Sequence, residues 1–354
     1  MKKLQFIIFL FLQLVCYTIY GQNKVKIGAY YFDGWRNSRS THLTPALVNN
    51  FSTREPKWGW VTSTQSIVND QIKVAANSGL SFFSFCWFYK KDGDHPLNSA
   101  LKFYLNSPNR NQLQFSLLIS NHAGYELGPS NWSDFQTRMI KLFKQPTYVT
   151  VNNKPLITFF SFQTLIKQFG STQNVAMAFK KFKLEAVRQG LIGIAIASCV
   201  PNDSKSIELA EECGFDILTG YNYHDVPLFR KSGNLPIETM IATERKIWNS
   251  FKTLSNLKYI PVSTLNWDPR PWANKENKYA TLPHYTGYSR KSVVKSVQGC
   301  AEWLLKNGSY TTSERIGLLY AWNEYGEGAY LTPTRKGESF ADGISEALKN
   351  LIAQ

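Results

Sequence analysis

The sequence predicts one α/β domain, a (β/α)₈ barrel of the TIM type that follows an N-terminal signal peptide. Short apolar runs, many of them β-branched or aromatic, alternate with eight longer segments of helical periodicity, as expected for parallel strands covered by helices. No linker rich in Pro, Gly or Ser and no internal repeat divides the chain. Barrels of this type span about 200 to over 400 residues as one domain. An open, doubly wound sheet is the alternative that the same pattern allows.

The first residues have the pattern of a secretory signal. Two lysines follow Met1, and Leu4–Ile19 is almost entirely apolar, which is short for a membrane span. Gly21 supplies the small residue expected at the cleavage site. We therefore expect residues 1–21 to be removed and residues 22–354 to form the barrel. The mature protein would be exported to the periplasm or the medium and would have no stable membrane span; a retained anchor is the alternative.

The strands are predicted from short apolar runs. The second is a continuous run, LSFFSFCWFY, with the length and aromatic content of a buried strand. A small hairpin that turns at Val151–Lys154 leads into the fourth. In chain order, the predicted strands are Val25–Phe32, Leu80–Tyr89, Gln114–Ser120, Leu156–Phe160, Gly193–Cys199, Asp216–Tyr221, Tyr259–Leu265 and Ile316–Ala321.

The helices are predicted from apolar residues that recur on one face. In Ser63–Ser78, for example, Ile67, Ile72 and Ala75 fall on the same side. A second helix is expected to start near His95-Pro96, because proline suits the first helical turn. The others predicted are Trp132–Phe143, Ala176–Gln189, Ser206–Glu212, Pro236–Thr253, Ser292–Leu305 and Ser345–Ile352.

The net charge and the cysteines narrow the function only slightly. The formal charge of +15 becomes 15 − 2 = +13 once the two lysines of the signal are removed. Such a surface could attract acidic glycans or a membrane surface, but the scattered lysines favour an ordinary solvated exterior.

The cysteines of the mature chain lie in apolar segments without a CxxC pair, which favours core positions over a zinc site. They are Cys86, Cys199, Cys213 and Cys300; a Cys199–Cys213 disulfide is left open.

Several common chemistries have no sequence signature here. The five histidines show no HExxH or HxH spacing, so no metal site is predicted. Neither GxGxxG nor GxxxxGK[ST] is present, and we predict no cofactor and no nucleic-acid partner. The GxSxG motif that carries the nucleophilic serine of many hydrolases is also missing from the sequence.

Side chains suited to sugar binding gather at the predicted carboxyl ends of the strands, where a β/α barrel carries its active site. Aromatic rings stack on the apolar faces of sugars, and amide, imidazole and carboxylate groups hydrogen bond to the hydroxyls. The alternative for any single residue is a structural role in an aromatic barrel interior. We predict that an oligo- or polysaccharide contacts Tyr30, Tyr31, Asp33, Trp35, Trp87, Tyr89, Asn121, His122, Tyr221, Asn222, His224, Asn266, Trp267, Asp268, Trp322 and Asn323.

Glu324 and Glu327 follow the last predicted strand in a glycine-containing turn, NEYGEG. Charged residues are rarely buried unless they are paired or functional. Two carboxyl groups in one site push their pKa values apart, so that one can serve as an acid and the other as a base. Glycoside cleavage uses such a pair. We therefore predict that both glutamates are catalytic, although an ExxE pattern also occurs as solvent-facing charge.

The segment AWNEYGEGAYLTPT at 321–334 resembles glycoside hydrolase family 99 and the related WbsX-like proteins. These families carry an Asn-Glu-x-x-Glu-Gly segment at the end of the last barrel strand. The resemblance extends through nearly the whole mature chain. Further matching segments are YYFDGW at 30–35, TREPKWGW at 53–60, QIKVAANSGLSFFSFCWFY at 71–89, VNNKPLITF at 151–159 and ERIGLLYAWNE at 314–324.

The resemblance implies a (β/α)₈ fold and cleavage of α-linked glycans, typically mannans, with retention and without a metal. It implies that Glu324 is the base that assists the sugar 2-hydroxyl, that Glu327 is the acid/base, and that Tyr31 lies in the substrate cleft. Family 99 has Trp-His between the glutamates, whereas this chain has Tyr325-Gly326. The sugar contact expected from that histidine is therefore absent, and mannan specificity does not carry over directly.

Three functions follow as hypotheses. The leading one is an exported glycoside hydrolase with a Glu/Glu acid–base pair. A glycosyltransferase of surface-polysaccharide synthesis would need an activated donor, and a non-catalytic glycan-binding barrel would tolerate loss of either glutamate. The sugar, the linkage, endo or exo action and the oligomeric state are not encoded in any motif recognised here.

Overall fold

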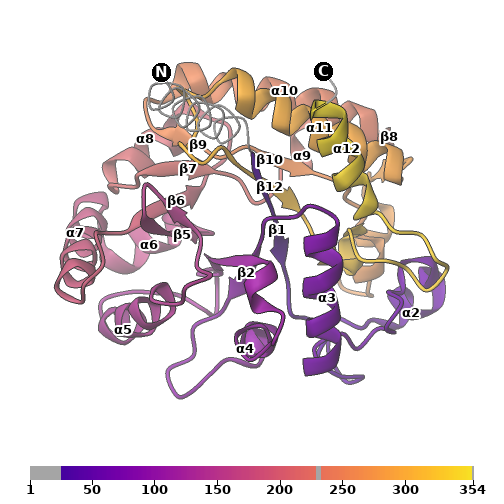
Figure 1. Cartoon of the computed structure of the whole chain (residues 1–354), viewed down its shortest axis with the longest axis horizontal. Coiled ribbons are helices and arrows are strands. Elements are labelled where there is room, and N and C mark those ends of the chain that lie inside the picture. The colour runs from indigo at the N-terminus through magenta and orange to yellow at the C-terminus, as the bar shows by residue number, and fades with distance from the viewer. Residues whose placement is uncertain (1–24, 229–232, 353–354) are drawn as a thin grey trace, which may run out of the picture.

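A curled parallel sheet forms the centre of the computed structural model, which describes residues 25–228 and 233–352 (Figure 1). Its strands follow the order β10-β12-β1-β2-β3-β5-β6-β7-β9, and the short β4 adds an antiparallel partner to β5. The bounds are β1 (Lys26–Tyr31), β2 (Phe82–Trp87), β3 (Gln114–Ile119), β4 (Thr150–Val151), β5 (Lys154–Phe159), β6 (Ala195–Cys199), β7 (Ile217–Thr219), β9 (Lys258–Tyr259), β10 (Val262–Thr264) and β12 (Ile316–Tyr320).

The two ends of this sheet, β9 and β10, are successive parts of one stretch of chain. Ile260 and Pro261 separate them, and proline interrupts the ladder because it has no N–H to donate. The Ile260 N–H donates to the Leu218 carbonyl at 2.9 Å on one side, and the Leu318 N–H donates to the Pro261 carbonyl at 2.9 Å on the other. The stretch therefore contacts β7 and β12 together. The predicted α/β class is confirmed in the form of a curled parallel sheet, whereas the complete (β/α)₈ barrel stays a prediction. The predicted seventh strand corresponds to β9 and β10.

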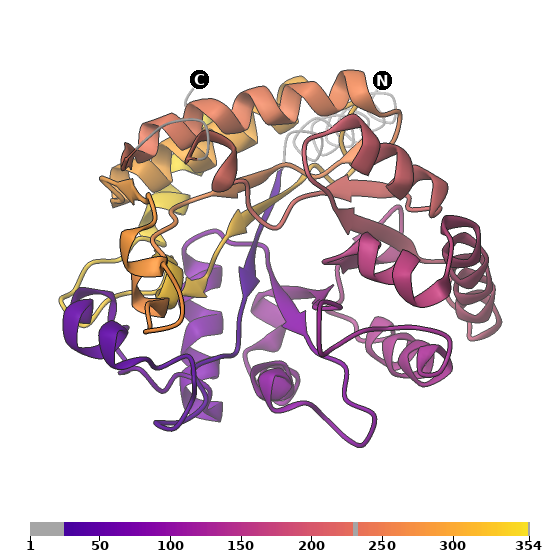
Figure 2. The ribbon, with the colours of Figure 1, turned by 180° about the vertical axis from the view of Figure 1, so that it is seen from behind.

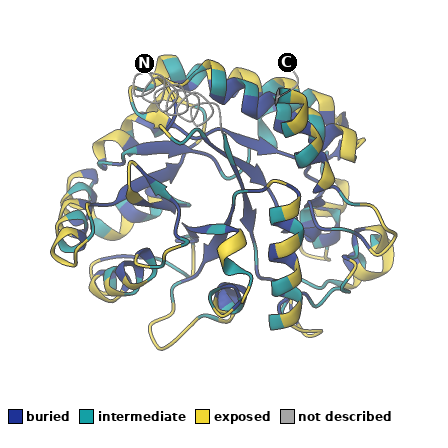
Figure 3. Ribbon diagram, in the orientation of Figure 1, coloured by how far each residue is buried: buried dark blue, intermediate teal, exposed yellow. Residues whose placement is uncertain are grey.

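Helices surround the sheet, as both views show (Figures 1 and 2). The faces that they turn toward it are buried (Figure 3). In α5, the buried Trp132, Phe135, Met139, Ile140 and Phe143 recur at helical spacing, so one stripe faces the core. The bounds are α2 (Pro45–Asn50), α3 (Gln65–Asn77), α4 (Ser99–Leu105), α5 (Trp132–Phe143), α6 (Phe162–Phe169), α7 (Thr172–Arg188), α8 (Ser204–Glu212), α9 (Asp225–Leu228), α10 (Ile237–Leu254), α11 (Arg290–Lys306) and α12 (Asp342–Ile352).

Some short elements were not predicted from the sequence. Helix α6 is one of them: Ser161 caps its start, and Gly170, at φ 87°, ends it after only two turns. The other short elements are the 3₁₀ turns η1 (Ser52–Arg54), η3 (Arg110–Gln112), η4 (Arg270–Trp272), η5 (Tyr279–Thr281) and η6 (Tyr325–Glu327), and the strands β8 (Leu235–Pro236), β11 (Tyr285–Thr286), β13 (Asn323–Glu324) and β14 (Ala329–Tyr330). The turn η2 (Pro96–Asn98), which leads into α4, begins where the second helix was predicted to start.

The predicted signal peptide, residues 1–21, lies outside the described residues. Within residues 25–228 and 233–352, no helix has both the length and the apolar character needed to cross a bilayer. Cys199 and Cys213 are both buried free thiols, so the disulfide left open by the sequence is not formed. Cys86 and Cys300 are buried free thiols as well, which agrees with the expected core positions.

Candidate active site

The two predicted catalytic glutamates lie on a tight turn just after β12. Glu324 ends β13, Glu327 ends η6, and Gly328 adopts a left-handed conformation at φ 70° that returns the chain into β14. Asn323 fixes the start of the turn, because its side chain accepts from the Phe32 N–H at 2.8 Å and donates to the Phe32 carbonyl at 2.7 Å. The turn is thus tied to the carboxyl end of β1 as well as to β12.

Each glutamate accepts a hydrogen bond from a tyrosine, of which Tyr320 is buried and Tyr221 partly buried. The Tyr221 hydroxyl donates to Glu324 Oε1 at 3.0 Å, and the Tyr320 hydroxyl donates to Glu327 Oε2. The two tyrosine rings contact each other, with ring centroids 4.8 Å apart. Tyr30 packs against Tyr221 from β1, at 5.1 Å between centroids. These rings form an aromatic floor below the carboxyl groups.

The surroundings of the two carboxyl groups differ in how strongly they favour the protonated form. Burial, and then the charge of Glu327, raises the pKa of Glu324 well above its usual value. Burial also raises the pKa of Glu327, but hydrogen bonding from Tyr320, Trp267 and Trp272 acts against it. Glu324 is only 6% exposed, whereas Glu327 lines an open cavity. These surroundings therefore favour the protonated form more strongly at Glu324 than at Glu327.

Trp272 occupies the space beside Gly326, between the two glutamates of the motif. A Cβ placed on Gly326 would lie 2.0 Å from Cζ2 of Trp272, so the turn has no room for a side chain while the indole is there. Trp272 reaches this position from η4 and lies nearly parallel to Trp35, at an interplanar angle of 15° and 6.5 Å between centroids. An indole from a distant loop thus fills the place beside the Tyr325-Gly326 pair.

A cavity of about 530 Å³ opens next to Glu327, at the carboxyl ends of the strands from β5 to β10. It brings together several residues predicted to contact sugar. The lining is Phe160, Ser161, Gln163, Cys199, Val200, Pro201, Asn202, Tyr221, Asn222, Tyr223, His224, Asp225, Val226, Trp267, Tyr279 and Glu327. Aromatic rings with amide and hydroxyl groups are the surfaces that bind a sugar.

His224 and Trp267 form a stacked pair in this cavity, with centroids 3.9 Å apart and planes at 18°. Burial lowers the pKa of His224 to about 4, so the imidazole is neutral near pH 7. Its Nδ1 lies 2.6 Å from Asn222 Oδ1, and the amide oxygen can only accept. Nδ1 therefore carries the hydrogen, and Nε2 is left as an acceptor for a hydroxyl donor.

Three of the predicted aromatic residues lie between the sheet and its helices instead of in the mouth. Tyr31 contacts phenylalanine rings of β2, at 4.8 and 5.2 Å between centroids. The ring of Trp87 lies 5.9 Å from Phe135 of α5, and the Trp322 indole donates to Gln71 of α3 at 2.7 Å. Alternate residues of a strand point to opposite faces of the sheet. A residue next to one that points into the interior of the curled sheet therefore points toward the helices. The prediction that they contact the substrate does not agree with this placement.

Other predicted residues have polar partners that hold the loops of the mouth. Asp33 accepts from the Ala100 N–H at 2.7 Å, and burial raises its pKa to about 7. The Trp35 indole donates to the Asn323 carbonyl at 2.8 Å. Asn121 bonds to Ser161 in both directions, at 2.7 and 2.9 Å. For Asp33, Trp35, Asn121 and Asn323, the structure thus gives a role in positioning loops instead of the predicted sugar contact.

Asp268 has two arginine partners at the rim. Arg54 forms a buried ion pair with it, and Arg270 binds it at 2.7 Å. Burial alone would raise the pKa of Asp268, but Arg270 and Arg54 hold it below the usual value. Asn266 donates to the Gly328 carbonyl at 2.9 Å. Both predicted residues therefore brace the glutamate turn from the β10 side.

The remaining two predicted residues lie at the β2–β3 side of the mouth. The Tyr89 hydroxyl donates to Asp134 at 2.9 Å. The ring of His122 contacts Phe160, at 5.8 Å between centroids, and Phe160 lines the cavity. Tyr320 and Trp272 were not among the predicted site residues; the signal for Trp272 is its place in NWDPRPW, shortly after the predicted seventh strand.

Comparison with known sequences gives one family. The sequence profile of the family described as Glycosyltransferase WbsX matches residues 58–341. A search of curated proteins found no match.

Solved structures with the same fold include glycan-active enzymes. The GH99 endo-alpha-mannosidase from Bacteroides thetaiotaomicron is 12% identical, with a TM-score of 0.62 and coverage of 93% of this chain and 99% of that one. A protein described as glycoside hydrolase-like is 13% identical, with a TM-score of 0.62 and coverage of 93% and 94%. GH5_18 from Streptomyces cattleya, solved with GlcNAc, is 9% identical, with a TM-score of 0.55 and coverage of 94% and 82%. At these identities the likeness shows a shared fold.

Proposed function

The chain belongs to the family described as Glycosyltransferase WbsX, and from this premise we propose that it is a glycoside hydrolase that cleaves α-linked glycans. Glu324 and Glu327 are the proposed catalytic residues. Its likeness in fold to the GH99 endo-alpha-mannosidase supports a glycan-active enzyme of this architecture, with the sheet closed as a (β/α)₈ barrel.

The observation that carries the proposal is the pair of carboxyl groups, Glu324 buried and Glu327 partly buried, at an aromatic cavity. Glycosidic bond cleavage needs one carboxylic acid that protonates the leaving oxygen and one carboxylate that acts as a base or nucleophile. Burial raises the pKa of both carboxyl groups and the charge of Glu327 raises that of Glu324 further, which favours one protonated and one ionised member of the pair. Tyr221, Trp267 and the neutral His224 offer stacking surfaces and hydrogen bonds for sugar rings.

The charges of the cavity favour a hydrolase over a transferase that uses a nucleotide sugar. The ionisable acids of the described lining are Glu327 and Asp225, and the one histidine there, His224, is neutral. A diphosphate donor would place further negative charge beside these carboxylates, which is unfavourable at short range. A protein that only binds glycans would have no use for two carboxyl groups with raised pKa values, whose burial costs stability.

The roles of the two glutamates can be assigned in two ways. The family resemblance implies that Glu324 is the base toward the sugar 2-hydroxyl and that Glu327 is the acid/base of a retaining reaction. In the free site, however, the proton favours Glu324. A bound sugar would have to move this proton to Glu327 if the resemblance holds for this chain.

The proposal is tested by reducing-sugar release from a panel of α-linked glycans. The Glu327→Gln and Glu324→Gln variants keep the side-chain shape but carry no titratable proton, and each should lose about a hundredfold or more in rate. Glu208→Gln, on the exposed surface of α8, is the matched control and should retain wild-type activity. Equal glycan binding without cleavage by all of these proteins would refute the hydrolase and favour the binding barrel.

A substrate with a reactive leaving group separates the two roles. An aryl glycoside whose phenol departs without protonation bypasses the general acid, so the variant that lacks the acid should retain much of its rate on this substrate. The variant that lacks the base should be impaired on both substrates. Rescue of Glu327→Gln supports the roles implied by the resemblance, and rescue of Glu324→Gln supports the reverse assignment.

We also propose that the protein acts outside the cytoplasm after removal of residues 1–21, as the N-terminal sequence predicts. Mass spectrometry of the N-terminus of the exported protein tests the cleavage site, which should leave Gln22 first.

A further inference from the structure

The outer face of α7 exposes aliphatic side chains. Met177, Leu184 and Val187 are 54%, 55% and 52% exposed, and Ile192, in the loop after the helix, is 60% exposed. Met177 and Leu184 are seven residues apart and therefore lie on the same side of the helix. Figure 3 shows α7 at the edge of the molecule with its exposed side outward. The outer face of a surface helix is normally polar, so this concentration of aliphatic groups indicates a contact surface.

Lysines lie among these aliphatic residues. Lys180 and Lys181 are exposed on the turn between Met177 and Leu184. The acidic residue of α7, Glu185, is already paired with Arg188 at 2.6 Å. Lysine stems can lie along an apolar surface while their ammonium groups reach a polar layer. Met177, Lys180, Lys181, Leu184, Val187 and Ile192 are called the α7 face below.

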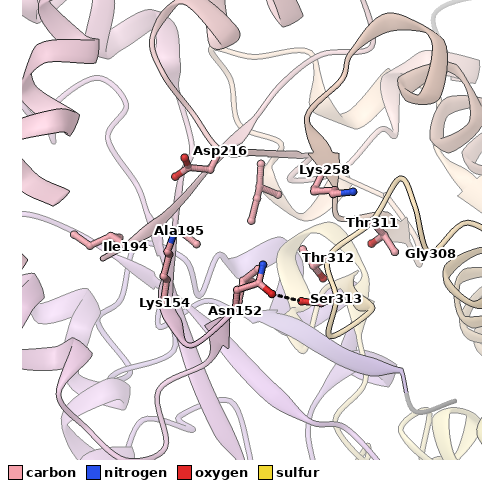
Figure 4. A pocket seen from close by; sticks show the side chains of 12 residues that line it. Asn152, Lys154, Ile194, Ala195, Asp216, Lys258, Gly308, Thr311, Thr312 and Ser313 are labelled. Carbon is pink, nitrogen blue, oxygen red and sulfur yellow. Dashed lines mark hydrogen bonds between the residues drawn. The ribbon is translucent and has the colours of Figure 1, made fainter. Parts of the chain in front are cut away.

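The basic character continues onto the amino-terminal rim of the sheet, around a hollow of about 290 Å³. Figure 4 shows the side chains that line it. Lys154 and Lys258 line it, and the Lys258 ammonium group donates to the Ser309 carbonyl at 2.6 Å. Asp216 also lines the hollow, but Lys183 of α7 binds it at 2.7 Å. The buried Thr311 hydroxyl at this hollow has no hydrogen-bond partner among the described residues.

A second hollow, of about 460 Å³, connects the rim with the α7 face. Lys180, Leu184, Val187 and Ile192 line it, together with Lys154, which it shares with the hollow at the rim. The aliphatic groups and the lysines therefore belong to one continuous surface. The cavity beside Glu327 lies at the carboxyl ends of the strands, whereas Ile192 precedes β6 at the opposite end.

We propose that the α7 face, with Lys154 at its edge, adsorbs to the surface of an anionic phospholipid bilayer. The aliphatic side chains would enter the boundary between headgroups and acyl chains, and the lysines would contact the headgroup phosphates. This orientation leaves the mouth of the sheet accessible to a glycan. The proposal does not depend on the proposed hydrolase activity.

The composition of the α7 face favours lipid over other partners. Glycan sites rely on aromatic platforms, and the six residues of this face are aliphatic or cationic. The centres of protein interfaces are rich in aromatic residues and arginine and depleted in lysine. A second copy docked through the same face would bring Lys180 and Lys181 close to their own equivalents, which is unfavourable.

Vesicle co-sedimentation of the full chain tests the proposal. Wild type should bind phosphatidylglycerol vesicles, bind phosphatidylcholine vesicles much less, and lose affinity as salt rises. Lys180→Ala with Lys181→Ala should lower the affinity for phosphatidylglycerol about twenty-five-fold, at about fivefold for each lysine charge near the surface. Leu184→Ser with Ile192→Ser should weaken binding even at low salt, because the apolar contribution is lost.

Lys90→Ala with Lys91→Ala is the matched control, because it removes the same charge from exposed residues that follow β2 at the opposite rim. It should bind vesicles nearly as well as wild type. All variants share one N-terminus, so any affinity of the apolar N-terminal segment is common to them. Because the changed side chains are exposed, thermal unfolding should be unaltered in each variant.

Three results would overturn the proposal. The first is equal binding to both kinds of vesicle, or to neither. The second is wild-type binding by both α7-face variants, which would assign the affinity to another part of the chain. The third is a dimer, seen by analytical ultracentrifugation without vesicles, that dissociates in the Leu184→Ser, Ile192→Ser variant; this would make the α7 face a contact between copies.

Discussion

Gly326→Ala directly tests how the motif turn is built. The new Cβ would lie 2.0 Å from Cζ2 of Trp272 and 2.5 Å from Cε2 and Cη2, far inside van der Waals contact. The indole must therefore move away from the turn. Trp272 is half-buried in a short 3₁₀ segment, so it can move without displacing the sheet. We expect a modest loss of stability, about 1 kcal/mol, at the low end for overpacked sites.

The larger effect should be on the pKa of Glu327. Hydrogen bonding from Trp272 favours its ionised form, and a hydrogen bond to a charged group contributes about 1.5–3 kcal/mol. Displacement of the indole removes this contribution and should therefore raise the pKa of Glu327. Trp272→Phe should raise it similarly, because phenylalanine has no N–H.

Carbon-13 NMR of labelled glutamate carboxyl groups measures this pKa in the free protein, with Glu327→Gln used for assignment. Gly308→Ala is the matched control, because a Cβ there would meet only one atom, the Arg315 Nη2, at 4.0 Å. In a Trp272→Ala background the ring is gone, so adding Gly326→Ala should not change the pKa of Glu327 further. An unchanged Glu327 pKa in Gly326→Ala, or an equal additional shift in the double variant, would refute the reasoning.

Three further predictions concern the groups around this turn. Tyr221→Phe removes the 3.0 Å hydrogen bond that favours ionised Glu324, so NMR titration should show a still higher pKa for Glu324, and an unchanged value would contradict the assignment. Glu324→Gln should raise the thermal midpoint at pH 7. A carboxyl group whose pKa is raised on folding makes the folded protein less stable as the pH rises above 4.5, the ordinary pKa of glutamate, and glutamine lacks this effect. The gain in thermal midpoint should therefore vanish near pH 4.5, and a gain that is the same at every pH would contradict this reasoning. Asp268→Asn leaves Arg54 and Arg270 without their shared carboxylate and should cost about 3–5 kcal/mol in denaturant unfolding, whereas a loss below 1 kcal/mol would show that the pair is solvated.

Much of the fold follows from local sequence patterns. The run LSFFSFCWFY could be identified as a strand because a strand buried on both faces is continuously apolar. The amphipathic period of Trp132–Phe143 coincides with α5. The interruption of the seventh strand at Ile260-Pro261 is visible in the sequence as a proline, but only the hydrogen bonds to Leu218 and Leu318 show that the chain there contacts both neighbouring strands.

The location of the candidate site at one rim of the sheet could be predicted from the positions of residues at strand ends. Glu324 and Glu327 could be selected because they directly follow the last strand, and carboxyl ends of parallel strands meet at one rim. The direction of a side chain was harder to predict: Tyr30 faces the floor of the site, whereas its neighbour Tyr31 packs against β2, because a shift of one residue reverses the face.

The sequence by itself determined the alternation of strands and helices, the carboxylate pair and the family, because each depends on residues that are close together in the chain. Tertiary structure decided which polar groups surround that pair. Tyr221 binds Glu324 across the sheet, and the indole of Trp272 covers Gly326 from another loop. These contacts join residues far apart in sequence, and their geometry depends on the curvature of the whole sheet, which no local pattern specifies.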